Sequence, residues 1–438
     1  SYPTAVEFHT GFTASDYREH LRRANEKAGA PLSLYTHLPF CEERCHFCAC
    51  HVIISPNKEV AHPYVQHLYR EIEMVAALLP DRREVSQFHW GGGTPTYYPA
   101  DDLVRLFRHY KRFFTFKEGA EIALEVDPRV TTFEQLDKLA AEGFNRMSMG
   151  VQDFNPEVQQ AINRIQSFEQ TRDLIEHGRS LGMHSINIDL IYGLPHQTPE
   201  SFRETLERSL ELSPDRVAVY SFALVPWIKA HQKYLPQESL PAPEVKLELL
   251  AIARESFLGA GYVDIGMDHF AKPDDSLSVA QREGRLWRNF MGYTNLKAND
   301  ILGFGVSAIG YVDDAFVQNV KKLTEYYEAI SSGELPVERG YALSHDDLAR
   351  QKVIQELMCN FVVRKRDVER EFGLDFDSYF AEDLALLKPL VEEGLAANEP
   401  DSVAARGHGR LFVRNIAMQF DRYLREKKRE KPTFSRTV

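Results

Sequence analysis

Four cysteines lie within a ten-residue segment, at positions 41, 45, 48 and 50. The first three follow the spacing C-x3-C-x2-C, and three thiolates on one loop can bind three corners of a 4Fe–4S cluster. We therefore expect Cys41, Cys45 and Cys48 to be cluster ligands. The alternative is a structural zinc site that includes His46 or His51, although zinc usually takes four protein ligands arranged as two separated pairs.

A cluster held by three cysteines leaves one iron free to bind another molecule. S-adenosylmethionine (SAM) can chelate that iron through its amino and carboxylate groups. Electron transfer from the reduced cluster then breaks a C–S bond and gives a 5′-deoxyadenosyl radical. Cys50 could be a fourth ligand, but its close offset from Cys48 fits a cube poorly and a full set would close the open iron. We interpret Cys50 as an active-site thiol and Cys359 as a buried core cysteine.

Two further patterns could bind SAM. Gly91-Gly92-Gly93-Thr94-Pro95 directly follows an expected strand, and the absence of a Cβ lets backbone groups approach a ligand closely. Glu125 ends an apolar strand, where an ionised carboxylate is costly without a partner. A ribose or an ammonium of a ligand would satisfy it, and so would a salt bridge with Arg129 or Arg146. Asp189 lies in another strand fit for burial, and we expect it to point into the same site.

Three other polar residues have more than one interpretation. Gln152 and Arg164 could be ordinary surface residues when they are considered alone. His269, in the segment Gly-Met-Asp-His-Phe, could serve metal or acid–base chemistry, and it could equally be a structural histidine.

These residues follow short apolar runs that alternate with segments of helical period. We expect six strands, near Leu32–His37, Val85–Trp90, Glu121–Val126, Arg146–Val151, Ser185–Tyr192 and Arg216–Phe222. We expect helices between them at His62–Leu79, Asp101–Phe114, Thr132–Glu142, Phe168–Leu181 and Pro199–Leu212. Strands separated by helices pair in parallel, and barrels of this kind collect reacting groups at the C-terminal ends of their strands. The pattern predicts an α/β fold with a partial (β/α)6 barrel.

The chain has 438 residues, which is more than one growing core usually supports. The strand–helix alternation stops near Glu334, after a helical stretch at Ala242–Leu258 and a seventh apolar run at Tyr262–Met267. Three later segments have a helical pattern: Ser344–Phe372, Asp375–Glu393 and Leu411–Lys428. We predict an N-terminal segment (residues 1–30), a catalytic barrel (31–335) and a mostly helical C-terminal domain (336–438), with a linker around residues 333–340.

Composition limits the classes of partner. A formal net charge of −12 argues against a dedicated nucleic-acid binder, and the basic stretch at 427–431 is interpreted as a solvated helix end. No apolar run approaches the ~18 residues of a membrane span. Five cysteines, four of them packed together, do not form a disulfide framework, so a reducing compartment, the cytoplasm, is expected.

Together these motifs resemble the oxygen-independent coproporphyrinogen III oxidases of the radical SAM superfamily. The resemblance covers essentially the whole chain and includes the fourth cysteine of the cluster segment. It is carried further by His89–Thr96 (HWGGGTPT), Glu125–Arg129 (EVDPR), Met147–Phe154 (MSMGVQDF), Asp189–Pro195 (DLIYGLP), Gly266–Ala271 (GMDHFA), Val279–Gly284 (VAQREG), Tyr379–Leu384 (YFAEDL) and Phe434–Arg436 (FSR).

The resemblance implies that coproporphyrinogen III is converted to protoporphyrinogen IX in haem synthesis, as two propionates become vinyl groups with loss of carbon dioxide. It also implies two SAM molecules. The first is expected to meet Tyr35, Gly92, Glu125 and Ile309, and the second Phe47, Gly93, Thr94, Gln152, Arg164, Asp189 and Ala223. Cys50, Tyr35 and Glu125 are the expected catalytic residues. A low-potential electron donor of the flavodoxin or ferredoxin type and a monomeric state are expected as well.

Two residues depart from the family pattern. Ala49 stands where the family usually has glycine, and Met291 replaces a glutamine that is common near the active site. Met291 and Cys50 leave open a radical SAM methyltransferase that would use the second SAM as methyl donor. A haem-binding chaperone of the same fold is the other alternative, and the four-cysteine segment argues against it.

Overall fold

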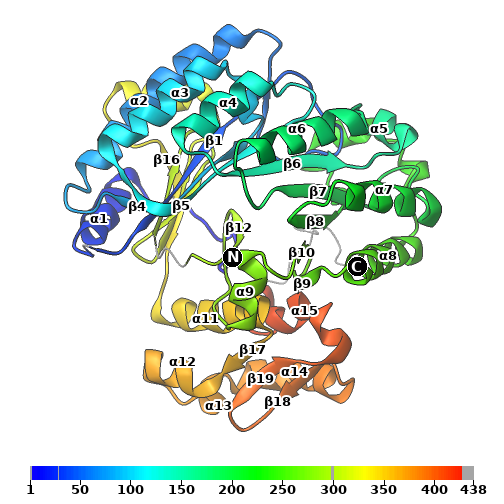
Figure 1. Ribbon diagram of the computed structural model, residues 1–438. Coiled ribbons are helices and arrows are strands. Elements are labelled where there is room, and N and C mark those ends of the chain that lie inside the picture. The colour runs from blue at the N-terminus through cyan, green and yellow to red at the C-terminus, as the bar shows by residue number, and fades with distance from the viewer. Residues whose placement is uncertain (1, 28, 297–299, 427–438) are drawn as a thin grey trace.

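Six parallel strands form the centre of the fold in the computed structural model, which describes residues 2–27, 29–296 and 300–426. In their order across the sheet they are β1 (Leu32–Leu38), β4 (Glu84–Gly92), β5 (Thr115–Val126), β6 (Arg146–Gln152), β7 (Asn187–Tyr192) and β8 (Arg216–Ser221). Helices cover the outside of this curved sheet (Figure 1): α2 (Ala61–Ala77), α3 (Ala100–Phe113), α4 (Phe133–Glu142), α5 (Pro156–Ala161), α6 (Phe168–Ser180) and α7 (Pro199–Glu211). The predicted partial (β/α)6 barrel is confirmed.

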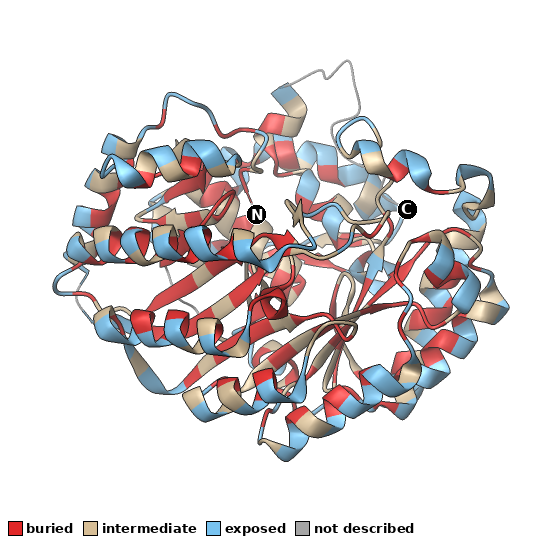
Figure 2. Ribbon diagram, turned by 90° about the horizontal axis from the view of Figure 1, so that it is seen from above, coloured by how far each residue is buried: buried red, intermediate tan, exposed pale blue. Residues whose placement is uncertain are grey.

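The sequence explains why these helices form and which faces they bury. Helix α7 begins as predicted at its N-cap Thr198, whose side chain accepts a hydrogen bond from the backbone of Ser201. In α3 the buried residues Leu103, Leu106, Phe107 and Tyr110 recur at helical spacing and pack on the strands. Figure 2 shows the result: the strands are largely buried, and each outer helix is buried on the side facing the sheet.

The sheet extends beyond the barrel at both edges, so that among the described residues it contains 12 strands. Next to β1 lie β13 (Asp300–Phe304), β14 (Ile309–Val312), β15 (Ala315–Asn319) and β16 (Val337–Ala342), and beyond β8 lie β10 (His269–Ala271) and β9 (Val263–Gly266). The sequence interpretation missed β10 and β13–β16. The second half of the segment predicted as a linker at 333–340 is the start of strand β16, which pairs with β15.

Smaller elements complete this part of the chain. The helices are α1 (Ala14–Asn25), α8 (Pro243–Gly259), α9 (Ser276–Arg282) and α10 (Leu323–Ser331), with short 3-10 turns η1 (Lys58–Val60), η2 (Pro95–Tyr97), η3 (Ala230–Tyr234) and η4 (Gln237–Ser239). Two pairs of short strands are β2 (Phe40–Cys41) with β3 (Ile53–Ile54), and the hairpin of β11 (Trp287–Asn289) and β12 (Gly292–Thr294).

The C-terminal region lies below the sheet in Figure 1 and has a core of its own, which includes Val353, Leu357, Phe376 and Phe420. Its helices are α11 (His345–Asn360), α12 (Lys365–Phe372), α13 (Phe376–Tyr379), α14 (Ala381–Glu392), α15 (Val413–Met418) and α16 (Arg422–Glu426), with the turn η5 (Gly407–Arg410). It also contains a small sheet of β17 (Val362–Arg364), β19 (Ser402–Ala405) and β18 (Ala396–Asn398).

The prediction of unbroken helix over Ser344–Phe372 is therefore wrong. Helix α11 ends at Phe361, whose backbone is left-handed with φ 60°, and β17 follows. The basic residues at 427–431 and the motif Phe434–Arg436 lie outside the described residues. Within the part of the chain that the structure describes, no helix is long and apolar enough to cross a membrane.

Buried Glu71 of α2 ties the helix to the sheet extension. Its carboxylate accepts hydrogen bonds from Gly305 N (2.8 Å), Tyr326 Oη (2.6 Å) and Asn319 Nδ2 (2.7 Å). Burial nevertheless raises the pKa of Glu71 from 4.5 to about 7. The folded state then holds a proton that the unfolded chain has lost, so this group's contribution to stability falls as pH rises from 4.5 to 7.

Glu71→Gln should remove that pH dependence. Between about pH 5 and pH 8 we expect the wild-type free energy of unfolding to fall by on the order of 3 kcal/mol relative to the variant. Urea unfolding at both pH values measures the difference. Glu204→Gln, the same change at an exposed position of α7, is the control and should track the wild type. Parallel pH profiles for Glu71→Gln and the wild type would contradict the assignment.

Candidate active site

A pocket of about 180 Å³ lies at the C-terminal ends of the barrel strands. Most of the predicted site residues line it together: Cys41, Cys45, Phe47, Cys48, Cys50, Gly92, Gly93, Thr94, Glu125, Gln152, Arg164 and Asp189. Tyr35, Ala223 and Ile309 do not line it. Residues from six separate segments of the sequence thus meet where reacting groups collect in barrels of this kind.

The cysteine loop rests on the end of β4. Gly93 N donates to Leu38 O (2.9 Å), and Thr94 N donates to Phe40 O (3.0 Å). A Cβ at Gly93 would stand 2.5 Å from the carbonyl group of Pro39, so only glycine allows this approach. The Thr94 hydroxyl lies 3.4 Å from Cys41 Sγ.

The thiols are graded in exposure: Cys45 is buried, Cys41 and Cys48 are half-buried, and Cys50 is exposed. Two guanidinium groups face the buried thiol, with Arg129 Nη2 at 3.5 Å and Arg164 Nη1 at 3.6 Å from Cys45 Sγ. Soft sulfur donors on one loop, beside cations that would stabilise their thiolate forms, fit an iron–sulfur cluster. Among the described residues, no three His, Cys, Asp or Glu side chains converge closely enough to hold a single metal ion.

A second segment, after β8, covers the outside of the cysteine loop. Side chains of Lys229, His231 and Gln232 donate to or contact backbone carbonyls of the loop. The distances are 2.9 Å from Lys229 Nζ to Cys50 O, 2.7 Å from His231 Nε2 to Cys48 O, and 3.0 Å from Gln232 Nε2 to Phe47 O. Gln232 also donates to Ala223 O (3.0 Å), which links that residue to the loop although it does not line the pocket.

Glu125 is held by β4. Its carboxylate accepts a hydrogen bond from Gly92 N (3.2 Å) and lies 3.3 Å from His89 Nε2. Burial acts to raise the pKa of Glu125, but the contacts with His89 and Gly92 outweigh it and lower the pKa below its ordinary value. Glu125 therefore stays ionised, and neither Arg129 nor Arg146 is its partner.

Tyr35 lies on β1, next to His89. Its ring stacks on His89 with centroids 6.1 Å apart, and its hydroxyl lies 3.0 Å from His37 Nδ1. Burial raises the pKa of Tyr35 well above its usual value, with the charge of Glu125 adding to the effect. Ile309 begins β14, and its carbonyl lies against Gly303, the strand partner of Tyr35.

Another part of the pocket wall is an ion-pair network around Asp127. Arg129 Nη2 lies 2.7 Å and Arg164 Nη1 3.0 Å from Asp127 Oδ2. Burial alone would raise the pKa of Asp127, but the two guanidinium groups lower it to about 2. Arg164 also donates to Gly150 O (2.7 Å), while its Nε is buried without a hydrogen-bond partner among the described residues. Arg164 is thus buried, and the interpretation of Arg164 as an ordinary surface residue is wrong.

Gln152 and Asp189 complete this wall. Gln152 has a left-handed backbone with φ 68°, a conformation that residues with a side chain rarely adopt. Asp189 accepts a hydrogen bond from Asn187 Nδ2 (2.8 Å) and faces the pocket. Among the described residues Asp189 forms no ion pair, unlike Asp127, and burial raises the pKa of Asp189 to about 7.

Sequence reasoning missed several of these contacts. His37, His89, Arg129 and the segment 229–232 were not predicted site residues. His89 and Arg129 carry a local signal, since each is next to or within a predicted motif. His269 packs its ring on Tyr220 and Tyr293, and its Nδ1 is buried without a hydrogen-bond partner among the described residues, so it is not the satisfied structural histidine of the simpler interpretation.

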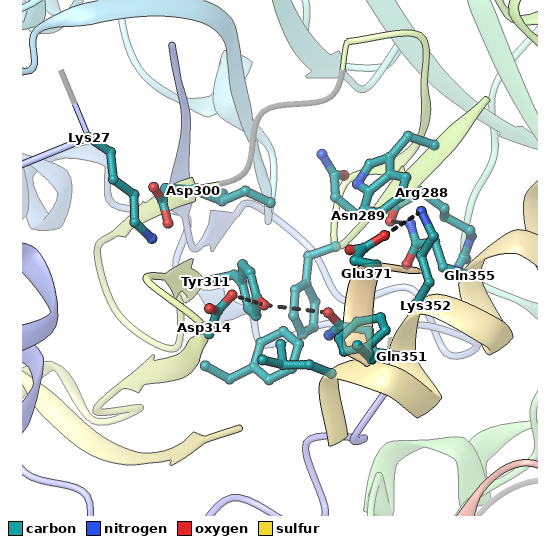
Figure 3. Close-up of a pocket in the computed structure, with 16 residues that line it drawn as sticks. Lys27, Arg288, Asn289, Asp300, Tyr311, Asp314, Gln351, Lys352, Gln355 and Glu371 are labelled. Carbon is teal, nitrogen blue, oxygen red and sulfur yellow. Dashed lines mark hydrogen bonds and ion pairs between the residues drawn. The ribbon is translucent and has the colours of Figure 1, made fainter. Parts of the chain in front are cut away.

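A larger cavity of about 380 Å³ lies away from the cysteines, between β13–β15, β11 and α11 (Figure 3). Its polar groups are largely engaged with one another. Lys352 pairs with Glu371 (3.3 Å), and Tyr311 Oη donates to Asp314 (2.9 Å). We therefore place the active site at the smaller pocket, which holds the cysteines.

Comparisons with known proteins show the family to which this chain belongs. Residues 35–208 match the family described as the Radical SAM superfamily, and residues 343–412 match the HemN C-terminal domain. Oxygen-independent coproporphyrinogen III oxidases from Salmonella typhimurium and Escherichia coli K12 are 48% and 47% identical over 438 residues, which cover 100% of this chain and 95% of each relative. The solved structure of coproporphyrinogen III oxidase (HemN) from Escherichia coli, titled a radical SAM enzyme, superimposes with a TM-score of 0.94 at 47% identity, over 97% of this chain and 96% of that one.

Proposed function

This chain belongs to the oxygen-independent coproporphyrinogen III oxidases, radical SAM oxidoreductases of haem biosynthesis, and we propose how its own residues carry out that reaction. The substrate is coproporphyrinogen III, in which two propionate side chains become vinyl groups to give protoporphyrinogen IX. Each propionate loses a β-hydrogen atom, carbon dioxide and one electron. The observation that supports the pocket as the site is the meeting of three cysteines, the glycine run, Glu125 and Asp189 in one cavity.

The family's cofactors are a 4Fe–4S cluster and SAM. When bound, they supply a 5′-deoxyadenosyl radical that abstracts hydrogen from unactivated carbon. Cys41, Cys45 and Cys48 would hold the cluster, and Arg129 and Arg164 would stabilise the charge at Cys45. Cys50 is exposed beside the pocket and would remain a free thiol that acts during turnover.

The two walls of the pocket suit two SAM molecules. On one wall, Glu125 is ionised and would accept hydrogen bonds from the first SAM, with Tyr35 and Ile309 forming the support behind it. On the other, Asp189 and Arg164 would receive the cationic and anionic groups of the second, together with Phe47, Gly93, Thr94, Gln152 and Ala223. Burial raises the pKa of Asp189, and the positive charge of bound SAM would favour the ionised carboxylate.

The electron donor, the cellular compartment and the oligomeric state are part of the same proposal. A low-potential donor of the flavodoxin or ferredoxin type would reduce the cluster. All five cysteines are free thiols, which suits a reducing compartment, and we propose the cytoplasm. We propose a monomer as the working state.

Glu125→Ala should weaken binding of the first SAM. A carboxylate that accepts hydrogen bonds from a ligand typically contributes about 1.5–3 kcal/mol, so the Kd should rise roughly tenfold or more. Equilibrium binding of SAM to the cluster-loaded variant measures this. Glu118→Ala, at an exposed position of β5, is the matched control and should bind as the wild type does. Unchanged affinity in a folded, cluster-loaded Glu125→Ala protein would refute the assignment.

The function itself is tested by one anaerobic assay with a chemical reductant, SAM and coproporphyrinogen III. We expect protoporphyrinogen IX and carbon dioxide. Methylated products would instead indicate a methyltransferase, and stoichiometric haem binding without SAM cleavage would indicate a haem chaperone.

A further inference from the structure

The segment that covers the cysteine loop has an apolar outer face. Trp227, Ile228 and Tyr234 are 56%, 59% and 75% exposed. The ring of Tyr234 also packs on His46 of the cysteine loop, with centroids 5.7 Å apart. Two aromatic rings and an isoleucine exposed on one short segment are a costly surface unless another molecule covers them.

The same surface is basic. Lys233 is exposed on the segment, and half-buried Lys229 and Arg44 lie beneath it, Lys229 toward Cys50 O and Arg44 in the lining of the pocket. Within the described ranges none of the three forms an ion pair. Of the acids nearby in the sequence, Glu42 pairs with Lys58 (2.9 Å), while Glu43 and Glu238 are exposed. The whole chain carries a formal net charge of −12, so this is a locally positive surface on an acidic protein.

The surface is also connected to the cluster ligands. Lys229 and His231 bind the carbonyl groups of Cys50 and Cys48 on the inner side of the segment. A molecule seated on Trp227 and Tyr234 would therefore stand one layer of protein away from the cysteines.

We propose that the segment 227–234 and the adjoining side of the cysteine loop form the docking surface for an acidic one-electron carrier protein. The carrier is oxidised by one electron and the cluster is reduced by the same electron. Opposite charges would speed the encounter, and the exposed aromatic rings would supply the small apolar contact typical of transient redox complexes. The inference rests on the proposed function, because only a redox-active cluster requires such a donor.

The binding test uses anaerobic holoenzyme and an acidic flavodoxin as the probe. Trp227→Ser/Lys233→Glu removes an aromatic contact and reverses a charge without touching the residues that hold the cysteine loop. We expect its Kd for flavodoxin to rise at least about tenfold, and the wild-type affinity to weaken between about 50 and 300 mM salt. Leu386→Ser/Lys388→Glu, the same kind of change on exposed positions of α14, should bind flavodoxin like the wild type.

The kinetic test compares two reductants in the same variants. With limiting flavodoxin, formation of 5′-deoxyadenosine should fall at least about tenfold in the Trp227/Lys233 variant, whereas with dithionite it should stay within about twofold of wild type. If the wild type shows no turnover with dithionite, the proposed function is contradicted. The docking surface is then tested by the flavodoxin binding measurement alone. Equal flavodoxin affinity in all three proteins would overturn the surface assignment.

Two other outcomes would also overturn it. A raised KM for coproporphyrinogen III with both reductants would assign the surface to the substrate path. Wild-type dimers that the Trp227/Lys233 change dissociates, seen by analytical ultracentrifugation, would assign it to a second copy of the chain.

Discussion

Replacing Cys41, Cys45 or Cys48 with serine is expected to abolish cluster binding, whereas Cys50→Ser is expected to keep the cluster and lose turnover. A serine hydroxyl is a hard, weakly acidic donor and does not replace a thiolate on iron. All four thiols line the pocket, but Cys41, Cys45 and Cys48 are buried or half-buried whereas Cys50 is exposed.

The measurements are bound iron, acid-labile sulfide and visible absorption after anaerobic reconstitution. The inner variants should retain almost no iron, and Cys50→Ser should retain the wild-type amount. Cys359→Ser, in a buried cluster that α11 forms with Ile265, Leu277 and Tyr293, controls for general loss of thiols and should reconstitute fully if it folds. Our ligand assignment would be wrong if Cys50→Ser lost iron as completely as the inner variants do.

Asp189→Ala is expected to reduce the SAM retained by the cluster-loaded enzyme from two molecules per chain toward one, and to suppress decarboxylation. SAM carries a sulfonium and an ammonium, and Asp189 is a buried carboxyl that lacks a cationic partner. Cleavage of the first SAM should persist, because the side chain of Asp189 bonds to Asn187 and contacts neither the cysteines nor Glu125 by a hydrogen bond among the described residues. Equilibrium SAM binding and uncoupled 5′-deoxyadenosine formation test the two parts separately.

The pH dependence of SAM binding at the second site has a definite sign. The pKa of Asp189 is raised to about 7 by burial, with Glu125 adding to the effect and Asn187 and Arg164 opposing it. The carboxyl is therefore protonated at lower pH and becomes the anion that SAM needs as pH rises through 7. Occupancy of the second site should increase over that range in the wild type and stay low in Asp189→Asn. A wild-type enzyme that never binds more than one SAM would refute the second site.

Arg164 provides an informative contrast. Its guanidinium contacts both Asp127 (3.0 Å) and Cys45 Sγ (3.6 Å). Arg164→Ala should therefore lower both the SAM ratio and the iron content, whereas Asp189→Ala should lower only the former.

The sequence predicts the barrel well because its six strands and their helices have clear apolar periods. It predicts the sheet extension poorly because strands β13 to β16 contain glycines at which the backbone of a neighbouring strand comes very close. Gly303 and Gly310 allow Ile309 and Ile301 to approach closely, and Gly340 does the same for Phe316. A glycine needed for close packing in a strand has the same sequence signature as a glycine in a loop.

The contacts of the site likewise divide into those that the sequence reveals and those that it does not. Cysteine spacing and the glycine run are local patterns, so a single segment of sequence reveals them. Lys229, His231 and Gln232 act on backbone carbonyls of a loop far away in the sequence, and any loop residue offers such a carbonyl. No spacing rule can reveal contacts of that kind. The Asp127–Arg164 pair was hidden for a related reason, since its two residues come from different βα units.

The glycine run at the end of β4 also bears on how this protein can evolve. A methyl group at Gly91 would stand 2.7 Å from Glu125 Oε1, a carboxylate held in place by His89 and Gly92. At Gly92 it would meet the ring of His37 from a left-handed backbone, and at Gly93 it would meet the rigid backbone of Pro39. Three identical neighbours are thus constrained by three different obstacles: a carboxylate of the site, a ring and the main chain. Natural variation should be rare throughout this run and rarest at its third position, where no side chain can give way.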